Sequence, residues 1–251
     1  MDLGLDGKAC IVTGASRGIG AATVRMLADE GARVLRVSRS VSGEDALALD
    51  VTEPDAGERA VAACLERFGA VDALVNNAGT SYFRSLDDLS DADWQEQWEL
   101  NVMASLRMMK AAVPRMAEAG GGRVVNVCSS AGKRPSLTNA AYSVTKAAQL
   151  SLSRVFADAW ASGGVLVNAV APGAVESPLW MAEGGLADQV AEAQGISREE
   201  AIEAQRGKIP LGRFGREDEI AATIVFLCSE RASNVTGAAW SVDGGTVPII
   251  L

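Results

Sequence analysis

Tyr142 and Lys146 form the best acid–base pair in this chain of 251 residues. The residues around them are typical of a helix, and a spacing of four places the phenol and the ammonium on one helix face. A phenol has an ordinary pKa of about 10 and is a weak base at neutral pH, so it needs a nearby cation to favour its ionised form. The same spacing also arises by chance, and an aromatic residue at a helix start often serves packing.

The chain contains no histidine. This absence excludes every Ser-His or Cys-His nucleophile pair and every histidine-ligated zinc site. The stretch Gly14-Ala-Ser16-Arg-Gly18 matches the G-x-S-x-G pattern of hydrolases, but Ser16 then lacks its usual base. Acid–base chemistry must therefore come from Tyr, Lys, Asp, Glu or Cys.

A glycine-rich turn follows the first apolar run and precedes a helical stretch. Glycines permit a tight turn, and the helix start offers unpaired N–H groups and the positive end of the helix dipole. This geometry suits the pyrophosphate of a dinucleotide, although three glycines could also serve only helix packing. The predicted contacts are Gly14, Ser16, Arg17, Gly18, Ile19 and Gly20.

The choice of dinucleotide depends on residues about 20 positions further on. There an acidic side chain binds a free ribose 2′-OH, whereas a basic side chain binds a 2′-phosphate. Ser38 stands at the acid position, Arg39 follows it, and Arg17 lies in the glycine turn. Two guanidinium groups can clamp a phosphate, so NADP is favoured, with NAD possible. The alternative is that both arginines are solvated surface charges.

Short apolar runs alternate with helical stretches along the whole chain. The nearly continuous apolar character of the runs predicts parallel strands that are covered on both faces. We therefore expect a single α/β domain over residues 1–251, a doubly wound Rossmann sheet of about seven strands with helices on both faces. The predicted strands are Ala9–Thr13, Arg33–Val37, Ala46–Asp50, Ala73–Asn76, Arg123–Cys128, Leu166–Ala171 and Ala239–Val242, and the predicted helices are Ile19–Glu30, Pro54–Phe68, Asp91–Met116, Asn139–Trp160 and Glu217–Ser229.

Two segments depart from strict alternation. Residues 39–49 are too few for a helix with its turns, so this crossover is expected to be a loop. Residues 176–208 contain no strand, but they hold a Gly-Gly pair and a helical stretch. A long segment after a strand's carboxyl end predicts a lid over a site.

Composition narrows the class of protein further. A net charge of −9 disfavours nucleic-acid binding, which depends on Lys and Arg. The four cysteines form no CxxC pair and are expected to be buried thiols, with no metal site. No apolar run approaches the roughly 18 residues that span a bilayer, and residues 1–8 lack a signal-peptide pattern. A cytoplasmic protein without a membrane partner is expected.

Taken together, these residues resemble the short-chain dehydrogenase/reductase family over essentially the whole chain, with its 3-oxoacyl-carrier-protein reductase-like members as the best match. The matching elements occur in order and at suitable spacings. They are Thr13–Gly20, Asp50-Val51, Asn76-Asn-Ala-Gly79, Asn101, Ser129, Tyr142 with Lys146, Pro172-Gly173, Ile209–Gly215 and Val242-Asp-Gly-Gly245.

The resemblance implies a role for each catalytic residue. Tyr142 exchanges a proton with the substrate oxygen, and Ser129 hydrogen-bonds that oxygen. Ser129 is preferred to Ser130 because it lies 13 residues before Tyr142, the family's usual separation. Lys146, together with a nicotinamide cation, lowers the pKa of the phenol and binds the ribose. Asn101 positions a water that links Lys146 to solvent.

The resemblance also implies the cofactor contacts outside the glycine turn and the assembly. The long helices 91–116 and 139–160 are expected to pair across subunits in a homotetramer. Expected substrate walls are residues 81–83, 133–137 and 179–181. The further cofactor contacts are Ser38, Arg39, Asp50, Val51, Asn77, Ala78, Gly79, Tyr142, Lys146, Pro172, Gly173, Val175 and Ser177.

The sequence therefore predicts an NADP-preferring oxidoreductase that interconverts a carbonyl and a secondary alcohol on a small molecule. One alternative is an NAD-dependent dehydrogenase of a sugar, polyol or steroid-like alcohol. The other is a cofactor-sensing protein without catalysis, although a sensor would not need Ser129, Tyr142 and Lys146 together.

Overall fold

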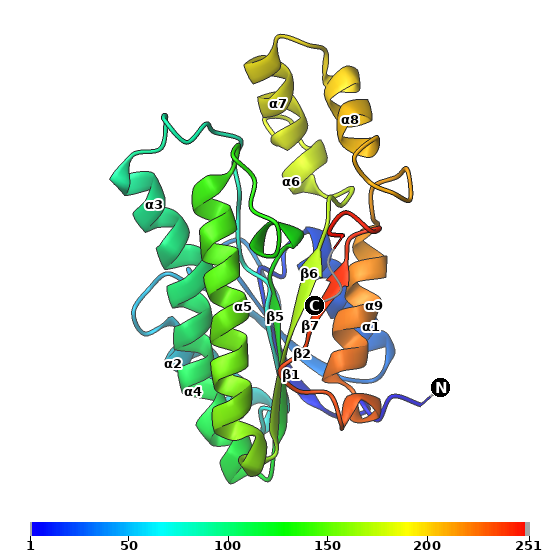
Figure 1. Ribbon diagram of the computed structural model, residues 1–251. Coiled ribbons are helices and arrows are strands. Elements are labelled where there is room, and N and C mark those ends of the chain that lie inside the picture. The colour runs from blue at the N-terminus through cyan, green and yellow to red at the C-terminus, as the bar shows by residue number, and fades with distance from the viewer. Residues whose placement is uncertain (1, 249–251) are drawn as a thin grey trace.

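Seven parallel strands form one sheet in the computed structural model, which describes residues 2–248 (Figure 1). The strand order is β3-β2-β1-β4-β5-β6-β7, and every neighbouring pair is parallel. The predicted doubly wound α/β fold is confirmed. The strands are β1 (Ala9–Thr13), β2 (Arg33–Ser38), β3 (Ala46–Ala48), β4 (Ala73–Asn76), β5 (Gly122–Val127), β6 (Val165–Pro172) and β7 (Ala239–Val242).

Helices cover both faces of the sheet, which explains why every residue of β1 and β4 is buried. Neighbouring residues of β1 enter different cores: Ile11 packs into one core, and Val12 packs into the other. The helices that contribute to the Ile11 core are α2 (Ala56–Phe68), α4 (Ala104–Glu118) and α5 (Ala140–Trp160), and those on the opposite face are α1 (Gly18–Asp29) and α9 (Glu217–Cys228) (Figure 1). Burial on two faces therefore fixes the central strands.

The predicted helix over residues 91–116 is interrupted. The structure divides it into α3 (Asp91–Trp98), a π-helical segment η1 (Glu99–Met103) and α4. A capping box begins α3: the Ser90 hydroxyl accepts from the Asp93 N–H, and the Asp93 carboxylate accepts from the Ser90 N–H. π segments inside α-helices frequently mark functional sites.

The helix predicted from Pro54 begins instead at Ala56. The Asp50 carboxylate accepts from the Thr52 N–H at 3.0 Å and from the Thr52 hydroxyl at 2.7 Å. The N–H of Glu53 bonds back to the carbonyl of Asp50 at 3.2 Å. These bonds hold the residues before α2 in a turn, which delays the helix start.

The crossover between β2 and β3 holds no helix among the described residues, so the predicted loop is confirmed. The segment over residues 176–208 forms three short helices that stand beyond the carboxyl ends of the strands (Figure 1). These helices are α6 (Pro178–Met181), α7 (Leu186–Gln194) and α8 (Arg198–Arg206). The segment thus lies where a lid would lie.

The chain leaves the middle of the sheet in two directions, from β1 toward β3 and from β4 toward β7. This reversal creates a crevice at the carboxyl ends of β1 and β4, the place where open α/β sheets bind ligands. Short 3₁₀ turns complete the fold at η2 (Ser130–Gly132), η3 (Ala161–Gly163) and η4 (Glu230–Ala232). Within residues 2–248, the structure contains no helix with the length and apolar character of a membrane span.

Candidate active site

A cavity of about 1150 Å³ opens at the carboxyl ends of the strands and extends under the lid segment. Two of the predicted site residues, Gly20 and Asn101, lie outside its wall. The other predicted residues all line it: Gly14, Ser16, Arg17, Gly18, Ile19, Ser38, Arg39, Asp50, Val51, Asn77, Ala78, Gly79, Ser129, Tyr142, Lys146, Pro172, Gly173, Val175 and Ser177.

The glycine turn has the shape that a phosphate group requires. Gly14 and Gly18 adopt φ values of +65° and +64°, which residues with a side chain rarely adopt. A Cβ at Gly18 would have no atom nearer than 3.7 Å, so the turn is open on that side. No side chain caps the start of α1, which leaves its first N–H groups available to an anion. The turn therefore fits a dinucleotide pyrophosphate.

Two side chains hold this turn in place: that of Thr13, at the end of β1, and that of Asn77, just after β4. The Asn77 side-chain amide donates to the carbonyls of Thr13 and Gly14 at 2.9 and 3.2 Å. The Thr13 hydroxyl accepts from the N–H groups of Asn77 and Ala78 at 3.0 and 3.1 Å. The side chain of Asn77 thus stabilises the turn, and Asn77 also lines the cavity.

Gly20 packs closely against the turn and lies outside the cavity wall. A Cβ on Gly20 would lie 2.3 Å from the Gly14 carbonyl oxygen and 2.4 Å from the Asn77 amide nitrogen. The absence of a side chain at this position lets α1 pack directly against the turn.

Two arginines lie at the end of the cavity near the glycine turn. Arg17, Ser38 and Arg39 line this end of the cavity, and the Arg39 side chain is 83% exposed. One Arg39 nitrogen lies 4.0 Å from a carboxylate oxygen of Asp50. Hydrogen bonds from Thr52 hold the pKa of the Asp50 carboxyl below its ordinary value, so this carboxylate stays charged beside Arg39.

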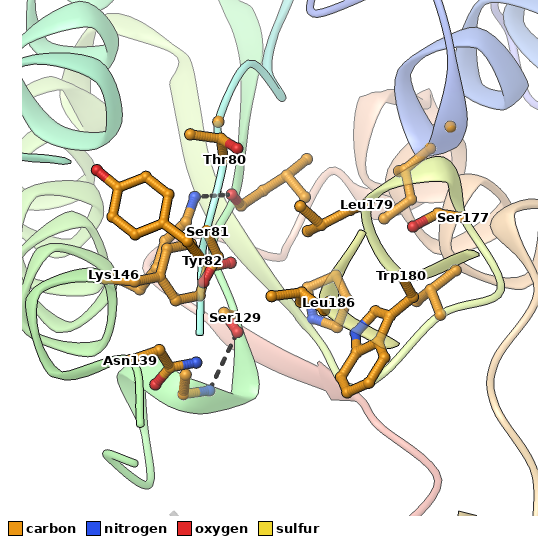
Figure 2. Close-up of a pocket in the computed structure, with 18 of the residues that line it drawn as sticks. Thr80, Ser81, Tyr82, Ser129, Asn139, Lys146, Ser177, Leu179, Trp180 and Leu186 are labelled. Carbon is orange, nitrogen blue, oxygen red and sulfur yellow. Dashed lines mark hydrogen bonds between the residues drawn. The ribbon is translucent and has the colours of Figure 1, made fainter. Parts of the chain in front are cut away.

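Ser129 and Tyr142 lie together at the other end of the cavity. The Ser129 hydroxyl accepts from the Ala131 N–H at 3.1 Å, which leaves its own proton free to donate (Figure 2). Burial raises the pKa of Tyr142 to about 12, and a hydrogen bond with Ser129 acts in the opposite direction. The pKa of Tyr142 is therefore raised in the protein alone, because burial outweighs the favourable contacts. The lowering expected from sequence includes the effect of a nicotinamide cation.

Lys146 lies one helical turn after Tyr142 and is buried. Its ammonium donates to the Val127 carbonyl at 2.9 Å (Figure 2). It also donates to the side-chain oxygen of Gln149 at 2.9 Å. It sits 5.6 Å from the centre of the Tyr142 ring. Burial lowers the pKa of Lys146 to about 8, because desolvation disfavours the charged form.

Asn101 is buried in η1, behind the cavity wall. Its side-chain nitrogen donates to Gln97 at 2.9 Å and to Thr145 at 3.2 Å, whereas its side-chain oxygen has no partner in the structure. That oxygen lies 2.9 Å from the position that a Cβ on Gly79 would take. An unpartnered buried oxygen suits an ordered water, and the water-holding role of Asn101 stays a prediction.

The substrate end is partly as predicted. Residues 81–83, 134–136, Leu179 and Trp180 line the cavity, whereas Lys133, Leu137 and Met181 do not. Figure 2 places Leu179, Trp180 and Leu186 across the cavity from Ser129 and Lys146. Lys133 instead donates to Ala239 and Ser241 on β7.

Several residues that line the substrate end of the cavity, chiefly on the lid helices, are not predicted from the sequence. Their signal was weak, because the apolar pair Leu186 and Val190 is spaced by four residues like any helix core. The missed residues include Thr138, Asn139, Leu186, Val190, Gln194, Ala201, Gln205, Lys208, Thr246 and Val247.

Comparison with known proteins gives matches over nearly the whole chain. A family model described as enoyl-(acyl carrier protein) reductase matches residues 14–247. The 3-oxoacyl-(acyl-carrier-protein) reductase FabG of Vibrio cholerae is 35% identical over 97% of this chain and 98% of its own length. Sorbitol dehydrogenase of Cereibacter sphaeroides is 33% identical over 96% of this chain and 98% of its own length.

Solved structures agree with these matches. L-sorbose reductase of Gluconobacter frateurii, complexed with NADPH and L-sorbose, superposes with a TM-score of 0.91 and 32% identity and covers 100% of both chains. The ligand-free aldohexose dehydrogenase of Thermoplasma acidophilum superposes with a TM-score of 0.88 and 30% identity, over 98% of this chain and 96% of its own.

Proposed function

Because this chain belongs to the short-chain dehydrogenase/reductase family and is an oxidoreductase, we propose that it prefers NADP and interconverts a carbonyl and a secondary alcohol. The observation that supports this most is a shared cavity. It holds the open glycine turn, the basic residues Arg17 and Arg39, and the pair Ser129 and Tyr142. A cofactor that reaches from the turn toward Tyr142 then meets the substrate beneath the lid.

The protein residues supply the proton chemistry in this proposal. Tyr142 donates its phenolic proton to the carbonyl oxygen during reduction, and Ser129 donates a hydrogen bond to the same oxygen. Lys146 holds its ammonium behind the phenol and binds the ribose hydroxyls. Asn101 keeps a water in place behind Lys146. NADP, when bound, supplies or accepts the hydride.

The proposed chemistry has a defined pH dependence. The raised pKa of Tyr142, about 12, keeps the phenol protonated through the neutral range, as a proton donor requires. The lowered pKa of Lys146, about 8, means that the neighbouring ammonium is lost as the pH rises through that value. We expect kcat/KM for reduction to be level below about pH 8 and to fall above it. Alcohol oxidation, which requires the phenol to lose a proton, should gain with pH until the ammonium is lost.

Initial rates in both directions across this range check the expectation. A reduction rate that rises steadily with pH would contradict a proton-donating phenol. No imidazole contributes an ionisation to either profile, because the chain contains no histidine.

NADP preference is supported by the surroundings of Arg39. Its guanidinium lies 4.0 Å from the Asp50 carboxylate and is otherwise exposed, so it is free to turn toward a 2′-phosphate. Replacement of Arg39 by alanine should weaken NADPH binding about tenfold or more, because charge-assisted bonds to phosphate are strong. NADH binding should change by less than about twofold.

The matched control is Arg36→Ala on β2, the strand that ends just before Arg39. Arg36 donates to the Ser42 carbonyl and lies outside the cavity wall, so its loss should leave both affinities unchanged. Binding titrations with both cofactors give the comparison. Tighter binding of NADH than NADPH by the parent protein, or an equal loss of both in Arg39→Ala, contradicts the NADP preference.

A panel of carbonyl and alcohol substrates with both cofactors tests the function as a whole. Sorbitol dehydrogenase and L-sorbose reductase among the relatives make polyols and ketoses a necessary part of the panel, beside acyl thioesters. Oxidation of polyols with NAD as the better cofactor favours the alternative dehydrogenase. Tight cofactor binding without turnover of any substrate favours the sensor.

Three further expectations stay predictions. The homotetramer is supported by exposed apolar side chains on α3 and α5, namely Trp98, Val144 and Val155, which are 42%, 45% and 62% exposed. The assignment of residues 1–251 to one domain with a lid at 176–208, and the cytoplasmic location, are the other two.

A further inference from the structure

A row of buried side chains connects Lys146 to the main chain of Asn101. The side-chain oxygen of Gln149 accepts from the Lys146 ammonium at 2.9 Å. The side-chain nitrogen of Gln149 donates to the Ser105 hydroxyl at 2.8 Å, and that hydroxyl donates to the Asn101 carbonyl at 3.4 Å. All four residues are buried. The connection therefore runs through side chains of α5 and α4 to the π-helical segment.

We infer that Gln149 is a positioning residue that holds the Lys146 ammonium in its catalytic place and ties it to the Asn101 segment. This inference rests on the proposed function only in assigning Lys146 to catalysis. Gln149 touches neither the cavity nor the reacting atoms, since it is absent from the cavity wall. It acts through Lys146.

The hydrogen-bond count of Lys146 supports the inference. An ammonium has three N–H donors. One is taken by the Val127 carbonyl and one by Gln149, which leaves the third. The ammonium also lies 3.5 Å from where a Cβ on Gly79 would stand, at the cavity wall. Two fixed bonds thus leave one donor for the ribose hydroxyls, on the side where the cofactor would lie.

The amide of Gln149 has only one orientation that satisfies its neighbours. Its oxygen must face the ammonium, because the opposite orientation would place the NH₂ group against three other donors. Its nitrogen then faces the Ser105 hydroxyl. A buried amide with both ends bonded is rigid, and its replacement by an apolar group leaves the ammonium short of an acceptor.

Few other charges act on this ammonium. The titratable groups that face it are the Tyr142 phenol on its own helix and the Cys128 thiol beyond the end of β5. Burial raises the pKa of each to about 12, so both are neutral where Lys146 titrates. Ser105 and Asn101, on the other elements packed against it, carry no charge. The acceptors of the ammonium therefore decide much of its ionisation.

The test is an NMR titration of the cofactor-free protein labelled with ¹³C-lysine, in which the Lys146 signal is assigned by its loss in Lys146→Met. Gln149→Met removes the acceptor at similar length, and the titration midpoint of Lys146 should fall by about one pH unit or more. Gln149→Glu supplies a carboxylate acceptor, and the midpoint should rise above that of the parent protein. A structural role alone would not move the midpoint in opposite directions.

Ser153→Ala is the matched control on the same helix. The Ser153 hydroxyl donates to the main-chain carbonyl of Gln149 at 2.7 Å and accepts from Asn126 at 2.8 Å, so its loss disturbs the same buried face without touching the ammonium. Its midpoint should equal that of the parent protein. If Gln149→Met does not fold, Gln149→Glu and Ser105→Ala carry the test, since Ser105→Ala frees the far end of the amide and should lower the midpoint slightly.

The decline of kcat/KM for reduction at alkaline pH, and the pH dependence of NADPH binding, should move with the NMR midpoint in each variant. Midpoints that stay within about 0.3 pH units of the parent value in Gln149→Met and Gln149→Glu would overturn the inference. Absence of turnover in the parent protein, with midpoints that move as expected, would instead refute the proposed function and leave the contact between Gln149 and Lys146 supported.

Discussion

Tyr142→Phe should lower kcat for carbonyl reduction by about a thousandfold and leave the Kd for NADPH within a few fold of the parent value. The substitution removes one oxygen and keeps the ring in its half-buried place on the cavity wall. A positioned general acid contributes about 10²–10⁴-fold to a rate, so its loss should account for nearly all turnover. Stopped-flow or steady-state rates with NADPH, together with binding titrations, measure both quantities.

The chain supplies its own control for this experiment, because it contains two tyrosines. Tyr82 also lines the cavity, but its hydroxyl donates to the Glu96 carboxylate at 3.1 Å. Tyr82→Phe should therefore change kcat by less than about tenfold, since it loses an exposed hydrogen bond. Equal losses in the two variants, or substantial turnover in Tyr142→Phe, would refute the assigned proton donor.

Gly20→Ala should destabilise the protein and cost most of its cofactor affinity. The new methyl group would lie 2.3 Å from the Gly14 carbonyl oxygen and 2.4 Å from the Asn77 amide nitrogen, distances that real Cβ atoms do not show. Both atoms belong to the rigid brace of the glycine turn, so the turn itself must move. Overpacking of this kind costs about 1–3 kcal/mol, or a Tm lower by about 2–12 °C for a chain of this size.

Cofactor binding should weaken together with stability. Displacement of the turn misaligns the N–H groups that would hold the pyrophosphate, and we expect the Kd for NADPH to rise about a hundredfold. Gly207→Ala is the control: this residue is helical, with φ −63°, and its Cβ would have 3.6 Å of clearance. It should match the parent protein in Tm and Kd. A Gly20→Ala protein with unchanged affinity would contradict the turn as the phosphate site.

The sequence predicts the sheet well because each central strand is buried on both faces. A nearly continuous apolar run such as Ala9–Thr13 is expected where helices cover both sides, and every residue of this run is buried, so the pattern identifies both strand and fold class. Chain length alone excludes a helix between β2 and β3. Most residues of the cavity wall can also be predicted, because the glycine turn and the strand ends meet at one edge of a parallel sheet.

The remaining features depend on contacts that no spacing reveals. The residues of η1 are ordinary helix residues, and the π-helical turn at Asn101 is visible only in the structure. Gln149 looks like any polar residue on a helix until α4 packs against it. The raised pKa of Tyr142 likewise follows from burial, which a local pattern does not measure.

Lys133 is expected from the sequence at the substrate wall, but its ammonium lies at the outer edge of the sheet instead. β7 is the last strand, and the carbonyls of Ala238 and Val242 bond to residues of β6 or just beyond it. The carbonyl of Ala239 instead accepts from the Lys133 ammonium at 2.6 Å. A strand edge with free main-chain acceptors invites another chain to add to the sheet, and a charged lysine on that edge discourages it. Lys133 thus places a positive charge on the outer edge of β7 and occupies one of its main-chain acceptors.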